Sequence, residues 1–343
     1  YTEGRSATFY LAAEEYIARA LPEDNYLFSW QLNPTVVMGR NQVAHAEIDL
    51  DFCRREGIDI VRRKSGGGAI FADQRNIMWS LITGEGAVEP LFADYVQTVA
   101  AALTALSVPA CVSGRNDIVL SGGGKVCGNA FYHLTDRNIV HGTMLYDTNA
   151  RLMQGALHPD TSKLESKGVK SVRSRVSLLK DFLPFGVDEL RRRLVDLLCD
   201  RSIQLGDDDV KEIEEIEKPY HASDYLFGSS AHSDAAFEGR IEGCGTLALH
   251  FRLRGSVVED VRLTGDFFEL ANAFSLGICR QGFHKGFSRR ISESKPAPTL
   301  HPQSFRSGLA EVAGSLTTKS PCFPRRHSLF YSRHSLLYKR HSL

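Results

Sequence analysis

Arg62-Arg-Lys-Ser-Gly-Gly-Gly-Ala-Ile-Phe71 is the segment that decides the fold of this chain. Without Cβ atoms, Gly66, Gly67 and Gly68 let backbone N–H groups approach an anion closely. The arginines and lysine just upstream can add charge-assisted hydrogen bonds to a phosphate. Apolar residues on both sides, Ile58-Asp-Ile-Val61 and Ala69-Ile-Phe71, predict a loop between two strands. A tight hairpin with a solvated basic face explains the same residues, and the segment alone leaves both interpretations open.

A second glycine run, Gly122-Gly-Gly124, precedes Lys125. It is not a nucleotide P-loop, because Val119 takes the place of the first P-loop glycine and Val126 replaces the hydroxyl residue that binds magnesium. A lysine that enters a strand after glycines can instead reach a carboxylate and an α-phosphate. An ordinary hairpin lysine is the alternative interpretation.

The rest of the chain mixes short strands with helices in no regular βαβ repeat, which predicts an α+β fold. Apolar spacing predicts helices at 10–21, 91–106 and 188–200. The predicted strands are 26–30, 36–38, 58–61, 69–71, 118–120, 141–146, 245–253 and one that starts at Lys125.

Four regions are predicted along the chain: a large domain at 1–205, a charged linker at 206–222, a small α+β accessory domain at 223–280, and a disordered tail at 281–343. The tail repeats Arg-His-Ser-Leu three times at a period of seven. Residues 285–343 carry a net charge of +9, and since the whole chain is formally neutral, the remainder carries −9. An acidic body argues against general nucleic-acid binding.

The number and spacing of the cysteines indicate the cellular compartment of the protein. All seven are dispersed, without a Cys-x-x-Cys pair or a zinc-like His spacing. Such a set favours a reducing cytoplasm over a disulfide scaffold. No apolar run approaches the roughly 18 residues of a membrane helix, so we expect no membrane association.

Several motifs in a fixed order resemble the lipoate–protein ligase family. The similarity covers roughly residues 6–200 and continues more weakly to about 272. In order, the motifs are YLAAEEY, NPTVVMGRNQ, RRKSGGGAIF, GRNDIVL, GGKVCGNAF, HGTMLYDT, KLESKGVKSVRSRVSLL, GCGTLALHFRL and GDFFELAN. Ordered motifs at consistent spacing are far more specific than any one of them.

The resemblance implies a biotin/lipoate-ligase-like catalytic domain that uses ATP, with Mg2+, to form lipoyl-AMP. The lipoyl group then passes to a lysine of lipoyl domains of 2-oxo acid dehydrogenases or of the glycine-cleavage H protein, as an amide. The family pattern implies catalytic roles for Lys125 and Asp117, the latter orienting or deprotonating the incoming amine. It implies ATP binding by Arg63, Gly66, Gly67, Gly68, Ala69, Ile70, Phe71 and Lys125, and lipoate binding by Lys125, His141 and Gly68; the metal ligands stay unidentified.

One position departs from the family pattern. Members often read His-Asp-x-Gly-Asn after the phenylalanine, whereas this chain reads Ala72-Asp-Gln-Arg-Asn76. Arg75 in place of glycine is expected to strain that turn.

Other functions stay open at this stage. An octanoyl or lipoyl transferase needs a cysteine thioester instead of ATP, and Cys127 is the one cysteine near the predicted site. A biotin ligase shares the adenylation logic. A non-catalytic binder of lipoyl domains or nucleotides belongs to a different class.

Overall fold

The computed structural model describes residues 4–84, 86, 88–114, 116–134, 136–157, 176–228, 235–241, 245–254 and 257–267. The chain divides into two compact units, Tyr1–Phe287 and Ser288–Leu343, and all described residues belong to the first. The predicted tail at 281–343 and the basic motif that begins at Lys163 lie outside the described residues, apart from the end of that motif.

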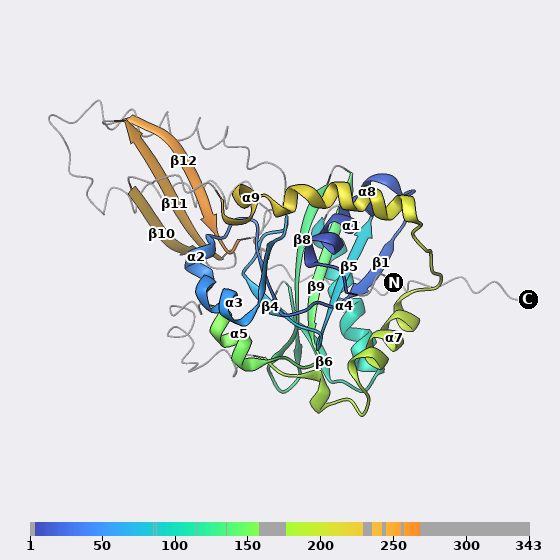
Figure 1. Ribbon diagram of the computed structural model, residues 1–343. Coiled ribbons are helices and arrows are strands. Elements are labelled where there is room, and N and C mark those ends of the chain that lie inside the picture. Colours follow the sequence, from blue (N-terminus) through green and yellow to red (C-terminus); the bar gives the residue numbers. More distant parts are fainter. Residues whose placement is uncertain are drawn as a thin grey trace, which may run out of the picture. The chain divides into compact units, whose positions relative to one another are not determined.

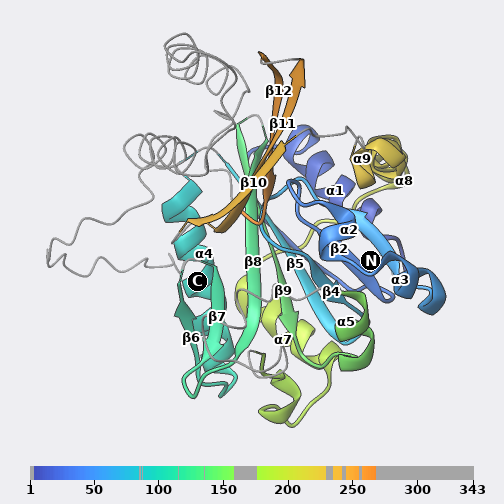
Figure 2. The same cartoon turned by 90° about the vertical axis from the view of Figure 1, so that its left-hand side faces the viewer.

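A six-stranded antiparallel sheet forms the centre of the first unit, with the order β1-β5-β9-β8-β7-β6. Figure 2 labels the strands from β5 to β6, and Figure 1 labels β1 beside β5. Its strands are β1 (Tyr26–Trp30), β5 (Asn76–Thr83), β6 (Ala110–Ser113), β7 (Asp117–Leu120), β8 (Lys125–Leu134) and β9 (Arg137–Leu145). The Gly122-Gly-Gly124 run is the turn between β7 and β8, so Lys125 begins a strand, as predicted.

A second sheet of three strands carries the other glycine run. Its order is β3-β2-β4, formed by β3 (Asp59–Arg62), β2 (Thr35–Met38) and β4 (Ile70–Ala72). β2 lies between the other two, parallel to β3 and antiparallel to β4. The hairpin interpretation of residues 63–69 is therefore wrong, because these residues cross the end of β2 instead of joining paired neighbours.

Helices cover both faces of the large sheet. On one face α4 (Val88–Ala105) and α7 (Val187–Leu198) pack on side chains that include Trp79, Val126 and Met144. On the other face lies α1 (Ala7–Ala20), whose first turn is capped by the Ser6 hydroxyl. Burial of these two apolar faces is the main driving force that holds the layers together.

The small sheet is also covered on both sides. Val37, Val61 and Ala72 face the core beneath α1, whereas Val36, Met38 and Phe71 face a third apolar cluster. That cluster includes residues of α2 (Ala44–Glu47), α3 (Leu50–Glu56) and α5 (Ala150–Ala156). The alternation of faces along each strand fixes the sheet between two cores.

The remaining described elements follow in the C-terminal part of the unit. They are the short helices η2 (Leu179–Asp181), η3 (Lys218–His221) and α9 (Ser223–Phe227), the helix α8 (Asp207–Glu217), and an antiparallel sheet of β10 (Ala235–Ile241), β11 (Gly245–Arg254) and β12 (Val257–Gly265). This mixture of helices with largely antiparallel sheets confirms the α+β prediction. In the part of the chain that is described, no helix is both long and apolar enough to cross a membrane.

Residues 206–222 differ from the predicted linker. Most of them form α8 and η3, and α8 runs along α1 (Figure 1). Ile213 and Tyr220 are buried in the same apolar cluster as α1. Arg5 and Ser6 bond Glu214 and Glu217 across this contact. The segment is therefore an integral layer of the fold, and the predicted division into domains at 205 and 223 stays a prediction.

We expect Ile213→Ala to destabilise the protein by about 2–5 kcal/mol, because it opens a cavity at a fully buried position. Urea unfolding followed by circular dichroism measures the change. Ile203→Ala is the matched control, since Ile203 is 59% exposed, and its effect should stay within about 0.5 kcal/mol. Equal, small effects for both variants would show that α8 is not part of the cooperative unit.

Candidate functional site

Arg63 holds the glycine loop from inside the protein. Its Nε donates to Ser65 Oγ (2.9 Å), and Nη1 donates to the carbonyl of Val37 (3.0 Å). Nη2 donates to the carbonyls of Gly66 (2.7 Å) and Gly68 (2.8 Å). Burial lowers the pKa of Arg63 to about 10, which still leaves the guanidinium charged at neutral pH. The loop is thus wrapped around one buried cation.

The other two basic residues of the motif also have protein partners. Arg62 donates to the carbonyls of Gly39 and Gln42, and to that of Leu226 in α9. Lys64 lies 2.5 Å from a Glu15 carboxylate oxygen. The expectation that this basic run points at a phosphate therefore differs from the structure, where the side chains of the run shape the surrounding loops. ATP binding by Arg63 stays a prediction.

Gly67 turns its backbone outward. Its φ of +87° lies in the region that favours glycine. Its N–H donates to the carbonyl of Phe267, two residues after β12, over 3.0 Å. The N–H of Gly67 is therefore directed away from Arg63, and in this structure its partner is the Phe267 carbonyl.

His141 ties the loop to the large sheet. It lies on β9, and its Nε2 is 2.6 Å from Ser65 Oγ. On the other side, its Nδ1 is 2.9 Å from Glu14 Oε1 on α1. The structure thus brings His141 to the glycine loop, while contact with lipoate stays a prediction.

A bulge aims Lys125 at the same face of the sheet. β8 has one extra residue, Val126, opposite the step from Ile118 to Val119 in β7. Because of this bulge, Val126 and Cys127 both point into the core beneath α4, where they are 0% and 1% exposed. Lys125 faces the opposite side, and a Cβ on Gly128 would lie 2.5 Å from its Nζ. A side chain at 128 would therefore displace the ammonium group from this position.

Lys125 and the glycine loop therefore share one face of the large sheet. His141, which contacts Ser65, pairs with Ala130 across β8 and β9. Ala130 is two residues from Gly128 on the same strand, and residues two apart in a strand share a face. The two predicted halves of the site, the glycine loop and Lys125, therefore lie on the same face of the large sheet.

Asp117 restrains Lys125. Its Oδ1 lies 2.7 Å from Lys125 Nζ, and both side chains are about one third exposed. The contact is ionic, because this oxygen has no hydrogen-bond partner among the described residues. The Lys125 ammonium is thus held in position by one carboxylate while its side chain stays partly exposed to solvent.

Two asparagines that we did not predict as site residues fix the turn beside this pair. Asn116 and Asn129 bond each other's backbone: each side-chain amide donates to the carbonyl of the other residue. The sequence signal was present in the adjacent motifs GRNDIVL and GGKVCGNAF, but it did not show that the two asparagines are partners.

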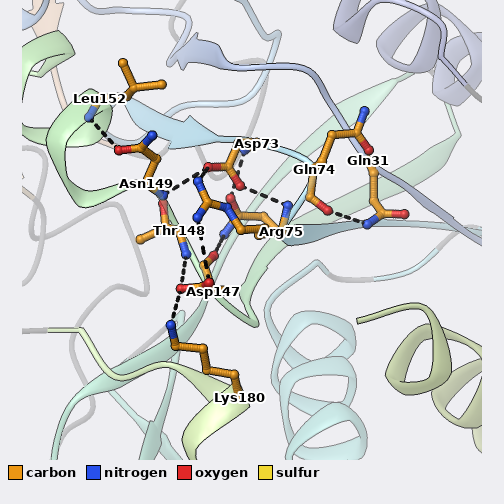
Figure 3. Close-up of polar contacts among 10 residues, drawn as sticks. Gln31, Asp73, Gln74, Arg75, Asp147, Thr148, Asn149, Leu152 and Lys180 are labelled. Atoms are coloured by element: carbon orange, nitrogen blue, oxygen red, sulfur yellow. Dashed lines mark hydrogen bonds and ion pairs between the residues drawn. The ribbon is translucent and has the colours of Figure 1, made fainter. Parts of the chain in front are cut away.

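The turn at Arg75 is not strained. Ser107 is the one described non-glycine residue with positive φ, so the expectation for Arg75 is wrong. The Arg75 N–H donates to Asp73 Oδ1 over 2.9 Å. This bond forms a turn around the Asp73 side chain, and such a turn does not require glycine at position 75. Its guanidinium lies between Asp73 (3.1 Å) and Asp147 (3.8 Å), and Asp147 also pairs with Lys180 (2.8 Å; Figure 3).

The charges of this cluster support one another. Burial raises the pKa of Asp147, but the hydrogen bonds from Lys180 and Thr148, with the charges of Lys180 and Arg75, outweigh it, so the pKa is lowered overall. Asp73 also accepts from the backbone N–H of Asn149, which caps α5. Arg75 thus joins the β4–β5 turn to the segment after β9.

Comparison with known proteins places this geometry in a family. The model of the lipoyl protein ligase A/B catalytic domain matches residues 6–198. Lipoate-protein ligase LplJ of Bacillus subtilis (strain 168) is 34% identical over 270 residues, which cover 75% of this chain and 81% of that protein. The chain belongs to the lipoyl protein ligase A/B family.

Solved structures show the same fold. The crystal structure of P. falciparum LipL1 in complex with lipoate has a TM-score of 0.66 at 17% identity, over 78% of this chain and 84% of that one. The crystal structure of lipoate-protein ligase A bound with ATP has a TM-score of 0.57 at 23% identity, over 65% of this chain and 94% of that one.

Within this lipoyl protein ligase A/B domain, Cys127 is a core residue. It is 1% exposed, and its Sγ lies 3.5 Å from Asn129 Oδ1. Burial raises the pKa of the thiol to about 12, and the nearby Lys125 charge only partly opposes this. The thiolate is the nucleophilic form of cysteine, so at neutral pH Cys127 is not suited to form a thioester.

Cys127 should resist alkylation by iodoacetamide at pH 8 in the folded protein. The shift of its pKa from 9.0 to about 12 reduces the thiolate fraction about 1,000-fold, and burial slows the reaction further. Cys111, which is exposed, is the internal control. Peptide mapping should show at least about 100-fold faster labelling of Cys111 in the folded protein, and similar labelling of both cysteines in urea. Comparable rates in the folded protein would contradict the burial of Cys127.

Proposed function

We propose that this protein is an ATP-dependent lipoate–protein ligase that forms lipoyl-AMP and transfers the lipoyl group to a lysine of a lipoyl domain. The observation that carries the proposal is that the Lys125 ammonium and the glycine loop lie on the same face of the large sheet. The relatives' names support the same chemistry: LplJ is a lipoate-protein ligase, and structural neighbours are bound to lipoate and to ATP.

The reaction has two steps. A carboxylate oxygen of lipoate attacks the α-phosphorus of ATP, the bond to the bridging oxygen breaks, and pyrophosphate leaves. The neutral amine of an acceptor lysine then attacks the acyl carbon, AMP leaves, and the nitrogen loses a proton to form the amide. The first step brings two anions together, so the protein must offset their repulsion.

We assign to Lys125 the role of offsetting the repulsion between the two anions. Its ammonium group projects from the face it shares with the glycine loop, close to the Gly128 backbone. From there it would contact both the lipoate carboxylate and the α-phosphate. The backbone of Gly66–Phe71 would bind the nucleotide, and Arg63 would act by shaping that backbone, because its donors bond the loop carbonyls.

Asp117 would act first on Lys125. Its carboxylate is paired with Lys125 in the structure, so we assign it mainly to holding the Lys125 ammonium and only secondarily to orienting the acceptor amine.

Mg2+ would enter with the nucleotide and neutralise phosphate charge. Among the described residues no cluster of three metal-ligating side chains exists, which suits an ion held by phosphates and one or two carboxylates. Asp117 is the carboxylate beside Lys125.

The acceptors we propose are lipoyl domains of 2-oxo acid dehydrogenases and the glycine-cleavage H protein, and the compartment is the cytoplasm. Unpaired cysteines at the four described positions agree with a reducing environment. The acyl transferase alternative is disfavoured, since the thiol near the site is buried and protonated. A non-catalytic binder leaves the Asp117–Lys125 pair without a role.

Incubation with ATP, lipoate and a lipoyl domain should add one lipoyl mass to the domain, and omission of ATP should abolish the change. Lys125→Ala should reduce lipoyl-AMP formation by about 100-fold or more, because it removes the cation beside the developing charge. Lys211→Ala on the exposed side of α8 is the control and should retain activity. Normal adenylate formation by Lys125→Ala would overturn the proposal.

Asp117→Asn should slow adenylate formation and transfer together, each by about 10- to 100-fold, because Lys125 loses its restraint. Single-turnover measurements with ATP, and then with preformed lipoyl-AMP, separate the steps. Asp208→Asn removes an exposed aspartate–lysine pair of similar length and serves as control. Loss of transfer alone would instead assign Asp117 to the acceptor amine.

A further inference from the structure

Glu14 is a carboxylate in an unusual place. It lies on α1 with 0% exposure, in the apolar cluster between that helix and the large sheet. A buried carboxylate is costly unless its oxygens accept hydrogen bonds. Here Oε1 accepts from Ser80 (2.6 Å) and contacts His141 Nδ1 (2.9 Å), while Oε2 accepts from Tyr132 (3.3 Å). The contacts of its neighbour Glu15 are separate, with Arg19, Lys64 and Tyr220.

The partners determine where each proton lies. His141 Nδ1 faces a carboxylate and donates its hydrogen to it, so Nε2 is the ring atom that faces Ser65. The Ser65 hydroxyl is fully buried and its proton needs an acceptor, so we assign that proton to the bond with Nε2, over 2.6 Å. The Ser65 oxygen in turn accepts from Arg63 Nε over 2.9 Å. Each proton is used once, in a continuous chain from Arg63 through Ser65 and His141 to Glu14.

This chain fixes the direction of the loop amides. Arg63 Nη2 holds the carbonyls of Gly66 and Gly68. A peptide unit is planar with N–H opposite C=O, so the N–H groups of Gly67 and Ala69 must point away from Arg63. The Gly67 N–H does so, toward the Phe267 carbonyl. The plane of Arg63, and with it the direction of these amides, depends on Ser65.

We propose that Glu14 is a positioning residue for the nucleotide, acting through His141 and Ser65 on the glycine loop. This inference rests on the proposed function, because it takes ATP as the ligand of the loop. Ser65 and Glu14 are both 0% exposed, so neither acts by direct contact with a ligand from solvent. The negative charge of Glu14 also balances the buried guanidinium, since it raises the pKa of Arg63 against the effect of burial.

The test is a double-mutant cycle on ATP binding. Glu14→Gln keeps the shape but loses the charge and one acceptor, and Ser65→Ala cuts the chain at the loop. Each should raise the dissociation constant of ATP, measured by calorimetry without lipoate, by about 10-fold. In the Ser65→Ala background, Glu14→Gln should add less than about 2-fold, because residues of one network are not additive. Tyr132→Phe removes a hydrogen bond from the same carboxylate outside the chain and should change ATP binding by less than about 2-fold.

Two results would overturn the inference. Additive effects of Glu14→Gln and Ser65→Ala would show that the residues act independently. A rise in KM for lipoate with unchanged ATP binding would place Glu14 in lipoate recognition instead. If Glu14→Gln does not fold, a Ser65→Ala protein with normal ATP affinity would likewise overturn the inference. A wild-type protein that binds ATP without forming lipoyl-AMP would contradict the proposed function, while the cycle would still decide the role of Glu14.

Discussion

The buried guanidinium of Arg63 is the interaction on which the site depends. Removing a cation from water is expensive, and here four hydrogen bonds to Ser65 Oγ and to the carbonyls of Val37, Gly66 and Gly68 offset that cost. Three of these acceptors belong to the glycine loop and one to β2. The same bonds that satisfy the charge therefore fix the loop to the sheet it crosses. The glycine segment adopts one defined conformation because its carbonyls are held by hydrogen bonds from the Arg63 guanidinium.

The two glycine runs look alike in sequence and do different things. Gly122–Gly124 joins two paired strands as an ordinary hairpin turn, and its role is to let β8 begin at Lys125. Gly66–Gly68 lies in the connection from β3 to β4, which crosses the end of the central strand β2. The backbone of this connection is therefore not paired within the small sheet. What unites them is the large sheet. The bulge at Val126 places Lys125 on the face where His141 meets the loop.

Local patterns predicted much of this fold. Apolar periodicity located α4, α7 and most strands of the large sheet, and the ordered motifs indicated the family. Partners distant in sequence could not be predicted, because nothing local shows that Arg62 bonds the carbonyl of Leu226 or that β2 separates β3 from β4. The missed helix α8 had a signal, Val210, Ile213 and Ile216 at a spacing of three, which its acidic residues obscured. Arg75 was misjudged because a family glycine was taken to mean positive φ.

Ser65, His141 and Glu14 have the connectivity of a serine-nucleophile triad, yet the physical setting excludes that chemistry. Ser65 is fully buried, and its oxygen already accepts a hydrogen bond from a cation, which lowers its electron density instead of raising it. Cys127 is likewise buried and protonated. With neither of these two side chains able to take the acyl group, activation of the carboxylate by the second substrate is the route that the proposed function uses. A glycine loop, a restrained lysine and two shielded side chains therefore support the proposed mixed anhydride with phosphate, in which the buried triad would aim the amides that hold it.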